Sequence, residues 1–146
     1  MRAADLVQPY PTVTLTTPAI EAARVLADSD LPGLIVLDDK GKPFAVLPGT
    51  QVLRLAVPSY CQDDPALTRM VDEAAADVFI RELGDRTVRE LLPPQPHELP
   101  IVRPQATALE MAALMARTRS PLVAVVDKEL LGAVTLHALL DRVLPA

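Results

Sequence analysis

Apolar side chains recur with helical spacing in two separate stretches of the chain. They fall at every third or fourth position, as on one buried helix face: Ala19, Ala22, Ala23 and Leu26 in the first stretch, and Ala108, Met111, Ala112 and Met115 in the second. The first helix is expected to begin near Thr17 and Pro18, since proline suits the first helical position. The second is expected to begin at Thr107, because Thr107 and Glu110 have the spacing of a capping box.

Both predicted helices lie within the same succession of elements. A short helical turn and a proline-rich extended segment precede each helix, and two strands joined by a hairpin and then a closing helix follow. Short apolar runs between turn signals are typical of buried strands. The expected elements are a turn at 5–7, strands at 12–15, 34–37 and 44–47 and a closing helix at 52–57, then a turn at 88–92, strands at 100–103, 122–126 and 132–135 and a closing helix at 136–144. The chain therefore reads as β-α-β-β-α, twice.

The two successions are an internal repeat. With a shift of 89 residues, Val13–Asp38 lies on Val102–Asp127. The identical pairs are Val13/Val102, Ala19/Ala108, Glu21/Glu110, Ala23/Ala112, Ala27/Ala116, Pro32/Pro121, Val36/Val125 and Asp38/Asp127. After a hairpin that is two residues shorter in the second copy, residues 44–57 match residues 131–144, and residues 4–7 also resemble residues 89–92.

This pattern predicts an α/β (α+β) fold built from two tandem repeats. We expect residues 1–60 to form the first repeat, 86–146 the second, and 61–85 a connecting helical segment. The positions with helical spacing in that segment are Leu67, Met70, Val71, Ala74, Val78 and Phe79. They predict an added helix from about 65 to 83, whose acidic polar side faces solvent.

Composition narrows the classes of function. Half of the 146 residues are apolar and 23% are charged, which is typical of a globular protein. The net charge of −5 comes without a stripe of Lys and Arg, and only 3% of residues are aromatic, so binding to DNA, RNA or an anionic membrane is not expected. No apolar run is long enough to span a membrane, no secretory signal is recognisable, and Cys61 has no cysteine partner. We therefore expect a cytoplasmic protein.

Patterns for catalysis or metal binding are missing from the sequence. Ser29, Ser59, Ser120 and Cys61 have no matching pattern of His and Asp partners, and the five glycines form no phosphate-binding loop. His97 and His137 have no cysteine or carboxylate at metal-ligand spacing. We expect neither an enzyme nor a metal site.

The repeated unit resembles the CBS domain, of which a pair forms a Bateman module. The resemblance rests on the order and lengths of the elements, on "VVD" before the second hairpin and on "GAVT" before the last helix. It covers nearly the whole chain apart from the helix at 65–83. It implies two repeats related by a pseudo-two-fold axis, with two clefts that in many members bind AMP, ADP, ATP, S-adenosylmethionine or cyclic dinucleotides. It also implies a homodimer that regulates an effector protein, either an enzyme or a transporter.

The ligand motif of this family is incomplete in both repeats. In nucleotide-binding members the last strand-to-helix junction reads Gly-hydrophobic-x-Thr/Ser-x-x-Asp, where Asp binds the ribose hydroxyls. Gly132, Val134 and Thr135 match this motif in the second repeat, but Ala138 stands at the Asp position. The corresponding residues of the first repeat are Ala45, Leu47, Pro48 and Gln51. A buried, charge-assisted acceptor contributes ~1.5–3 kcal/mol, so both repeats are expected to bind an ordinary nucleotide more weakly.

By the same resemblance, the segments before the buried strands complete the two clefts. The second repeat offers Arg117 and Arg119 there, whereas the first offers Asp28 and Asp30, so an anionic ligand is expected to prefer the second cleft. The predicted ligand-binding residues are Arg119, Ser120, Pro121, Leu122, Thr135 and His137. The alternative cleft in the first repeat contains Pro32, Gly33, Leu34 and Gln51.

Each polar candidate also has a structural interpretation. The hydroxyl of Thr135 can cap the following helix, and the amide of Gln51 can bond to backbone near a helix start. His137 can be a solvated residue in the first turn of a helix, and Arg117 and Arg119 can pair with neighbouring acids.

Two functions therefore remain open. One is a stand-alone regulatory module, in which an adenosine-type ligand in an inter-repeat cleft shifts the arrangement that an effector protein reads. The other is a dimerisation or interaction module with vestigial clefts, which docks through its closing helices, Val52–Val57 and Leu136–Leu144.

Overall fold

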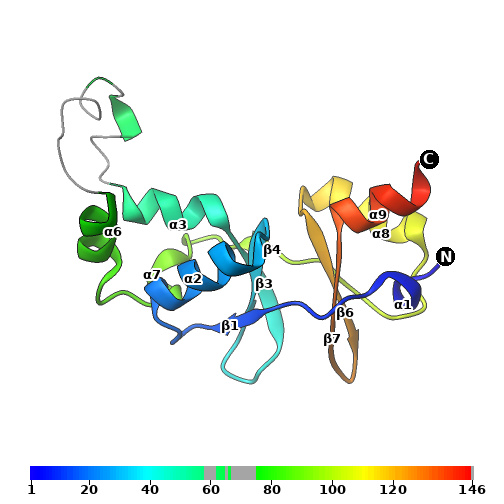
Figure 1. Ribbon diagram of the computed structural model, residues 1–146. Coiled ribbons are helices and arrows are strands. Elements are labelled where there is room, and N and C mark those ends of the chain that lie inside the picture. The colour runs from blue at the N-terminus through cyan, green and yellow to red at the C-terminus, as the bar shows by residue number, and fades with distance from the viewer. Residues whose placement is uncertain (58–61, 65, 67–74, 146) are drawn as a thin grey trace.

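The computed structural model describes residues 1–57, 62–64, 66 and 75–145 (Figure 1). Its helices are α1 (Ala3–Leu6), α2 (Ala19–Ser29), α3 (Gly49–Ala56), α6 (Ala75–Leu83), α7 (Val88–Leu91), α8 (Ala108–Thr118) and α9 (Leu136–Val143). Its strands are β1 (Thr12–Thr14), β2 (Gly33–Leu37), β3 (Pro43–Pro48), β4 (His97–Glu98), β5 (Ile101–Val102), β6 (Leu122–Asp127) and β7 (Glu129–Thr135). The α+β fold with two β-α-β-β-α repeats is therefore confirmed.

Within the described residues, the strands form two sheets, with orders β1-β2-β3-β4 and β5-β6-β7. In each repeat the strand before the long helix runs parallel to the strand after it, which in turn pairs antiparallel with the third strand. The central runs Leu34–Val36 and Leu122–Val125 are completely buried. They read as continuous apolar segments because helices cover one face of each sheet and the other sheet covers the second face.

A short segment near the start of each repeat lies along the third strand of the other repeat. β4 pairs antiparallel with β3, with His97 opposite Val46. In the second sheet Gln8 lies opposite Ala133 of β7, joined by backbone hydrogen bonds of 3.0 Å in both directions. Gln8 is equivalent to His97 in the repeat, so the pseudo-two-fold axis relates these two pairings. The sequence did not predict β4, because a strand of two residues has no periodicity.

The first short helix of each repeat packs against the other repeat. The backbone N–H of Ala3 in α1 donates to the carbonyl of Ala106, at 2.8 Å. In the same way the N–H of Val88 in α7 donates to the carbonyl of Thr17, at 2.9 Å. Figure 1 shows α1 beside α8 and α9, and α7 beside α2. Each sheet is therefore completed by a helix that the sequence assigns to the other copy.

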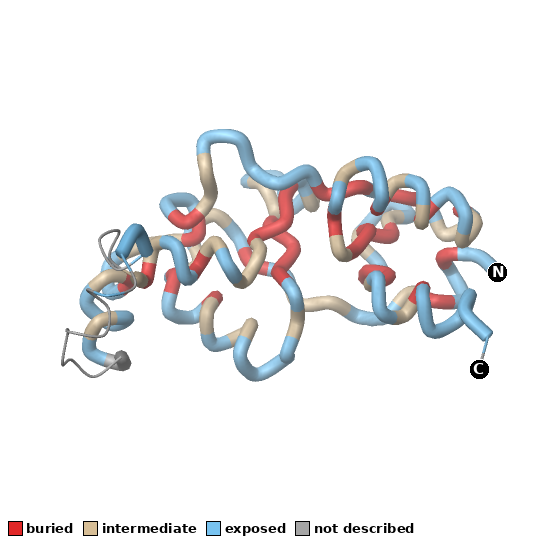
Figure 2. The backbone as a smooth tube through the Cα atoms, turned by 90° about the horizontal axis from the view of Figure 1, so that it is seen from above, coloured by how far each residue is buried: buried red, intermediate tan, exposed pale blue. Residues whose placement is uncertain are grey.

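Three buried clusters hold the molecule together. One lies between the first sheet and α2, α3, α6 and α7, and a second between the second sheet and α1, α8 and α9. The third lies between the two sheets, in the middle of the molecule in Figure 2. Its buried members are Ile35, Val46, Leu99, Leu122, Ala124 and Ala133. The repeats thus share one continuous apolar contact rather than a linker alone.

The structure adjusts the predicted helix boundaries. The sequence predicted Pro18 as the first helical residue of α2. In the structure Pro18 is the N-cap, and the helix begins at Ala19. Thr107 caps α8 as expected, since its Oγ accepts a 3.2 Å hydrogen bond from the Glu110 N–H. Of the helix predicted from about 65 to 83, Ala75–Leu83 forms α6, and most of the remainder lies outside the described residues. α6 packs on α2 and α3.

Candidate functional site

An apolar groove runs between α8 and α9 on the outer face of the second repeat. Its volume is about 730 Å3, and its lining is almost entirely apolar. The residues that line it are Ala108, Leu109, Ala112, Met115, Ala116, Arg119, Ser120, Pro121, Leu136, Leu139, Leu140 and Val143. The groove exists because alanines on the exposed side of α8 leave space that Leu139 and Met115 fill only at the floor. Leu109 is 79% exposed at the rim.

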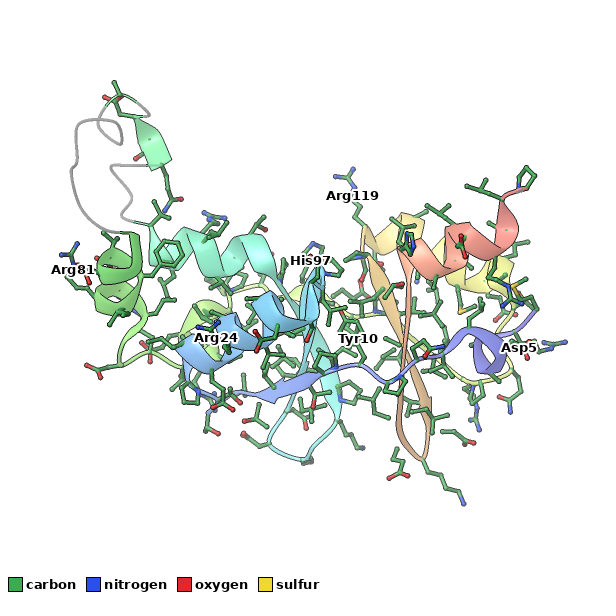
Figure 3. All side chains as sticks on the ribbon, viewed as in Figure 1. Asp5, Tyr10, Arg24, Arg81, His97 and Arg119 are labelled. Atoms are coloured by element: carbon green, nitrogen blue, oxygen red, sulfur yellow. The ribbon has the colours of Figure 1, made fainter. Side chains whose placement is uncertain are left out.

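Three of the predicted ligand-binding residues lie together at one end of this groove. Arg119 ends α8 in the left-handed conformation, with φ of 56°, and its side chain extends away from the sheets toward solvent (Figure 3). Ser120 is buried, and its hydroxyl donates a 2.7 Å hydrogen bond to the carbonyl of Leu122. The carbonyl of Pro121 accepts a 2.8 Å hydrogen bond from Leu136 N–H. These bonds fix the end of the groove, and they occupy the Ser120 hydroxyl.

The other three predicted residues point elsewhere. Leu122 is buried in the cluster between the two sheets. Thr135 is the N-cap of α9, and its Oγ accepts a 3.1 Å hydrogen bond from Ala138 N–H. His137 is exposed and lines a separate hollow with Leu140, Asp141, Leu144 and Pro145. Leu122 and Thr135 are cross-strand neighbours, but the six side chains lie in four different surroundings.

The alternative cleft of the first repeat is centred on Gln51. Its side-chain amide donates a 2.9 Å hydrogen bond to the carbonyl of Leu91, the last residue of α7. Gln51 also lines a hollow of about 370 Å3 between the start of α3 and the segment around β4. The other lining residues are Pro48, Pro93, Gln95, Pro96, His97 and Glu98. The lining of this hollow is partly polar, whereas that of the groove on α8 and α9 is almost entirely apolar.

The remaining residues predicted for that cleft belong to the framework. The carbonyl of Pro32 accepts a 3.1 Å hydrogen bond from Gly49 N–H, and Leu34 is completely buried. Gly33 faces β3 so closely that a Cβ atom would lie 2.8 Å from the carbonyl oxygen of Leu47. These three residues shape the start of β2. Of the four residues predicted for this cleft, Gln51 is the one that lines the hollow at the start of α3.

Tyr10 lies between the two repeats, and no local sequence pattern predicts this position. Its hydroxyl donates a 2.5 Å hydrogen bond to the carbonyl of Gly33, and its ring packs on the cluster between the sheets (Figure 3). Burial raises the pKa of Tyr10 to about 12, although the bond to Gly33 acts in the opposite direction. The repeat contains the signal that could have identified it, since Tyr10 is equivalent to Leu99, which is buried in the same cluster.

The described residues show neither a metal cluster nor a membrane-spanning helix. In this part of the chain, His, Cys, Asp and Glu side chains do not gather in groups of three that could hold a metal ion. The helices found there are all too short or too polar to cross a bilayer.

Comparison with known proteins gives a consistent result. The family model of the CBS domain matches residues 3–56 and 88–145. No curated protein sequence matches the chain. Among solved structures, a CBS domain-containing protein of unknown function from Kribbella flavida is 51% identical, with 98% of each chain covered and a TM-score of 0.89.

More distant structures show the same fold. CBSX2, solved in complex with AMP, is 20% identical, with 97% of this chain and 94% of that chain covered and a TM-score of 0.65. Hypoxic Response Protein I, solved with two coordinated zinc ions, is 19% identical, with 99% and 100% covered and a TM-score of 0.67. The family match covers most of both repeats and agrees with their topology, so the chain belongs to the CBS domain family and is a tandem pair of CBS repeats.

Proposed function

We propose that this CBS pair is a regulatory module that works as a homodimer through the groove between α8 and α9. The observation that carries the proposal is the groove itself, a continuous apolar hollow of about 730 Å3 on the outside of the molecule. Contiguous exposed apolar surface of this kind marks an interaction site in soluble proteins. The alanines at 108, 112 and 116 let another helix approach α8 closely.

The side chains around the groove have the character of an interface. Leu109, Leu140 and Val143 are large, apolar and exposed at its rim, and burying each of them would stabilise a complex by about 1–2 kcal/mol. Arg119 is the one charged residue among the lining residues. An effector protein would then read the arrangement of the dimer rather than a single protomer.

The hydroxyl and amide groups predicted to hold a nucleotide are already engaged within the protein. Ser120, Thr135 and Gln51 bond to backbone groups, and the positions of the family's ribose carboxylate hold Ala138 and Gln51. Ligand binding would therefore have to compete with these bonds. This favours interaction over high-affinity nucleotide recognition as the main function.

The mass of the protein in solution tests this proposal. Light scattering across a dilution series should give the mass of a dimer that dissociates on dilution. Leu109→Glu should shift the protein toward the monomer, because it places a charge on the apolar rim while leaving the core intact. A wild-type monomer at all concentrations, or a dimer that Leu109→Glu leaves unchanged, would refute a dimer built on this groove.

A second candidate function is the binding of an adenosine-type ligand, such as AMP, ATP, S-adenosylmethionine or a cyclic dinucleotide. The observation that favours it is the partly polar hollow beside Gln51 and His97, at the strand-to-helix junction where the family motif lies. The AMP complex of CBSX2 shows that this fold can hold such a ligand. In the second repeat, Arg119 and Thr135 remain the residues proposed to prefer an anion.

Thermal unfolding separates the two candidates. At a ligand concentration about a hundred times the dissociation constant, specific binding adds about 2.7 kcal/mol to the free energy of unfolding. AMP, ATP, S-adenosylmethionine and cyclic di-AMP are the probes. If a shift appears, three variants assign its site: a larger loss with Gln51→Ala places the ligand in the hollow beside Gln51, and a larger loss with Thr135→Val and Arg119→Ala places it in the second repeat. No shift with any probe would reject the adenosine-type ligand.

A further inference from the structure

The apolar groove between α8 and α9 differs at its two ends. α8 runs for 11 residues, from Ala108 to Thr118, which corresponds to about 16 Å of helix. At one end of the groove lie Leu109 and Val143, whose exposed fractions are 79% and 52%. At the other end lies Arg119, the one charged residue of the lining. The groove is therefore long and apolar, with a single positive charge at one end.

The guanidinium group of Arg119 is accessible to a ligand. Its side chain is exposed and extends toward solvent (Figure 3). Among the described residues, no hydrogen bond or ion pair engages this group. The neighbouring Ser120 cannot take its place, since its buried hydroxyl already donates to the carbonyl of Leu122. A guanidinium group binds a carboxylate through two parallel hydrogen bonds, so this end of the groove favours an anionic head group.

The first repeat lacks both features of this groove. The hollow between α2 and α6 measures about 370 Å3, which is about half the volume of the groove. Arg24, the arginine that lines this hollow, already pairs with Asp28, at 3.9 Å between Nη1 and Oδ1. The position equivalent to Arg119 holds Asp30. A molecule with a long apolar chain and one negative charge should therefore select the second repeat.

We infer that the groove binds a long-chain carboxylate of the fatty-acid class, with the carboxylate at Arg119 and the acyl chain along α8 and α9 toward Leu109 and Val143. The groove volume of about 730 Å3 falls within the range of about 300–1,000 Å3 for small-molecule sites, which combine an apolar lining with few polar groups. The net charge of −5 disfavours an anionic bilayer as the source of the chain, so the ligand is a single soluble molecule.

This ligand extends the proposed function, because a bound acyl chain and a second copy of the protein would compete for the same groove. The competition rests on the proposed homodimer, and saturation with the ligand should convert the dimer into the monomer. The binding itself depends on the groove and on Arg119, and it does not require a dimer.

A series of saturated fatty acids tests the apolar part of the site. Calorimetric titration with octanoate, decanoate and dodecanoate, below the concentrations at which they form micelles, should show the affinity rising about fourfold for each added CH2 group. Ala112→Phe should remove most of the binding, because it fills the groove. The matched control is Ala113→Phe, at an exposed position of α8 that does not line the groove, and it should leave the affinity unchanged. Circular dichroism confirms that each variant is folded.

Decanol isolates the contribution of the head group, because it has the same chain as decanoate without the negative charge. Arg119→Gln should weaken the binding of decanoate by about tenfold and leave the binding of decanol unchanged. The matched control is Arg117→Gln, which removes a positive charge that does not line the groove, and it should affect neither compound.

The outcomes distinguish the ligand site from the homodimer. No binding of any fatty acid, or equal losses with Ala112→Phe and Ala113→Phe, would overturn the site and leave the homodimer to its own test. Equal losses of decanoate and decanol with Arg119→Gln would overturn the placement of the carboxylate. A wild-type monomer would refute the homodimer and the competition, whereas binding to that monomer that strengthens with chain length would support the site.

The competition has its own measurement. Light scattering of a wild-type dimer should show the mass of the monomer once dodecanoate saturates the protein. A dimer that keeps its mass at saturation would overturn the competition, because the groove would then be free in the assembly.

Discussion

At the scale of single residues, Gly132 shows how closely the two repeats approach. Its φ is 150°, and a Cβ atom there would lie 2.1 Å from the carbonyl oxygen of Gln8. The equivalent residue of the first repeat is Ala45, so the repeat motif does not demand glycine at this position. Glycine is required in the second repeat because the segment around Gln8 lies directly on β7.

Gly132→Ala is therefore expected to lower the free energy of unfolding by about 2–4 kcal/mol, through backbone strain and the contact with Gln8. Urea denaturation measures the change. The matched control is Gly41→Ala, where φ is 80° but no atom lies within 4 Å of the added Cβ. That variant should lose only about 1 kcal/mol, from conformation alone. Equal losses would show that the contact with Gln8 contributes nothing.

Tyr10 links stability to alkaline pH. Its pKa is about 12 in the folded protein and 10.0 in the unfolded chain, so folding favours the protonated phenol. The stability from this group is fully present below pH 10 and is lost as the pH rises from 10 toward 12. Unfolding in urea at pH 9, 10 and 11 should show wild type losing stability faster than Tyr10→Phe. Parallel losses in the two proteins would contradict a folded-state phenol that resists ionisation.

At the scale of elements, α1 and α7 each pack on the other repeat, so a substitution in either helix should destabilise a sheet that is distant in the sequence. Leu6 of α1 is buried in the core of the second repeat, and its counterpart Leu91 of α7 is buried in the core of the first. Each substitution by alanine should cost about 2–4 kcal/mol. The loss should fall on the sheet that the helix covers, not on the repeat to which the residue belongs in sequence.

Hydrogen exchange can locate that loss. Leu6→Ala should reduce amide protection in β6, for example at Val123 and Val125, more than in β2. Leu91→Ala should reduce protection in β2, for example at Leu34 and Val36, more than in β6. A Leu6→Ala variant that loses protection mainly in β2 would contradict the exchange of helices.

At the scale of the whole molecule, most of the fold follows from local patterns, but the site does not. The spacing of Ala108, Met111 and Met115 predicts α8 because one face of a helix must be apolar to pack on a sheet. The pairing of Gln8 with β7 and the burial of Tyr10 depend on contacts between segments that lack a local signal. Both contacts could have been predicted only by extending the repeat alignment to the residues before the first strand of each repeat.

The candidate site was predictable in part. The sequence predicted that Thr135 could cap a helix and that Gln51 could bond to backbone, and both bonds are present. It did not predict that Arg119 and Ser120 would lie at the end of an apolar groove, because the groove depends on which side of α8 stays open. In the first repeat α6 packs on the equivalent helices α2 and α3, and this contact joins segments with no shared sequence pattern.

The exchange of α1 and α7 also sets the order in which the protein can fold as it is made. α1 is translated well before Leu139, which belongs to the core that α1 joins. At ~5–20 residues per second, the first helix waits for on the order of 10 s before its partners exist. The first repeat, by contrast, can close as soon as α7 has emerged. α1 therefore packs into its core long after it has been translated.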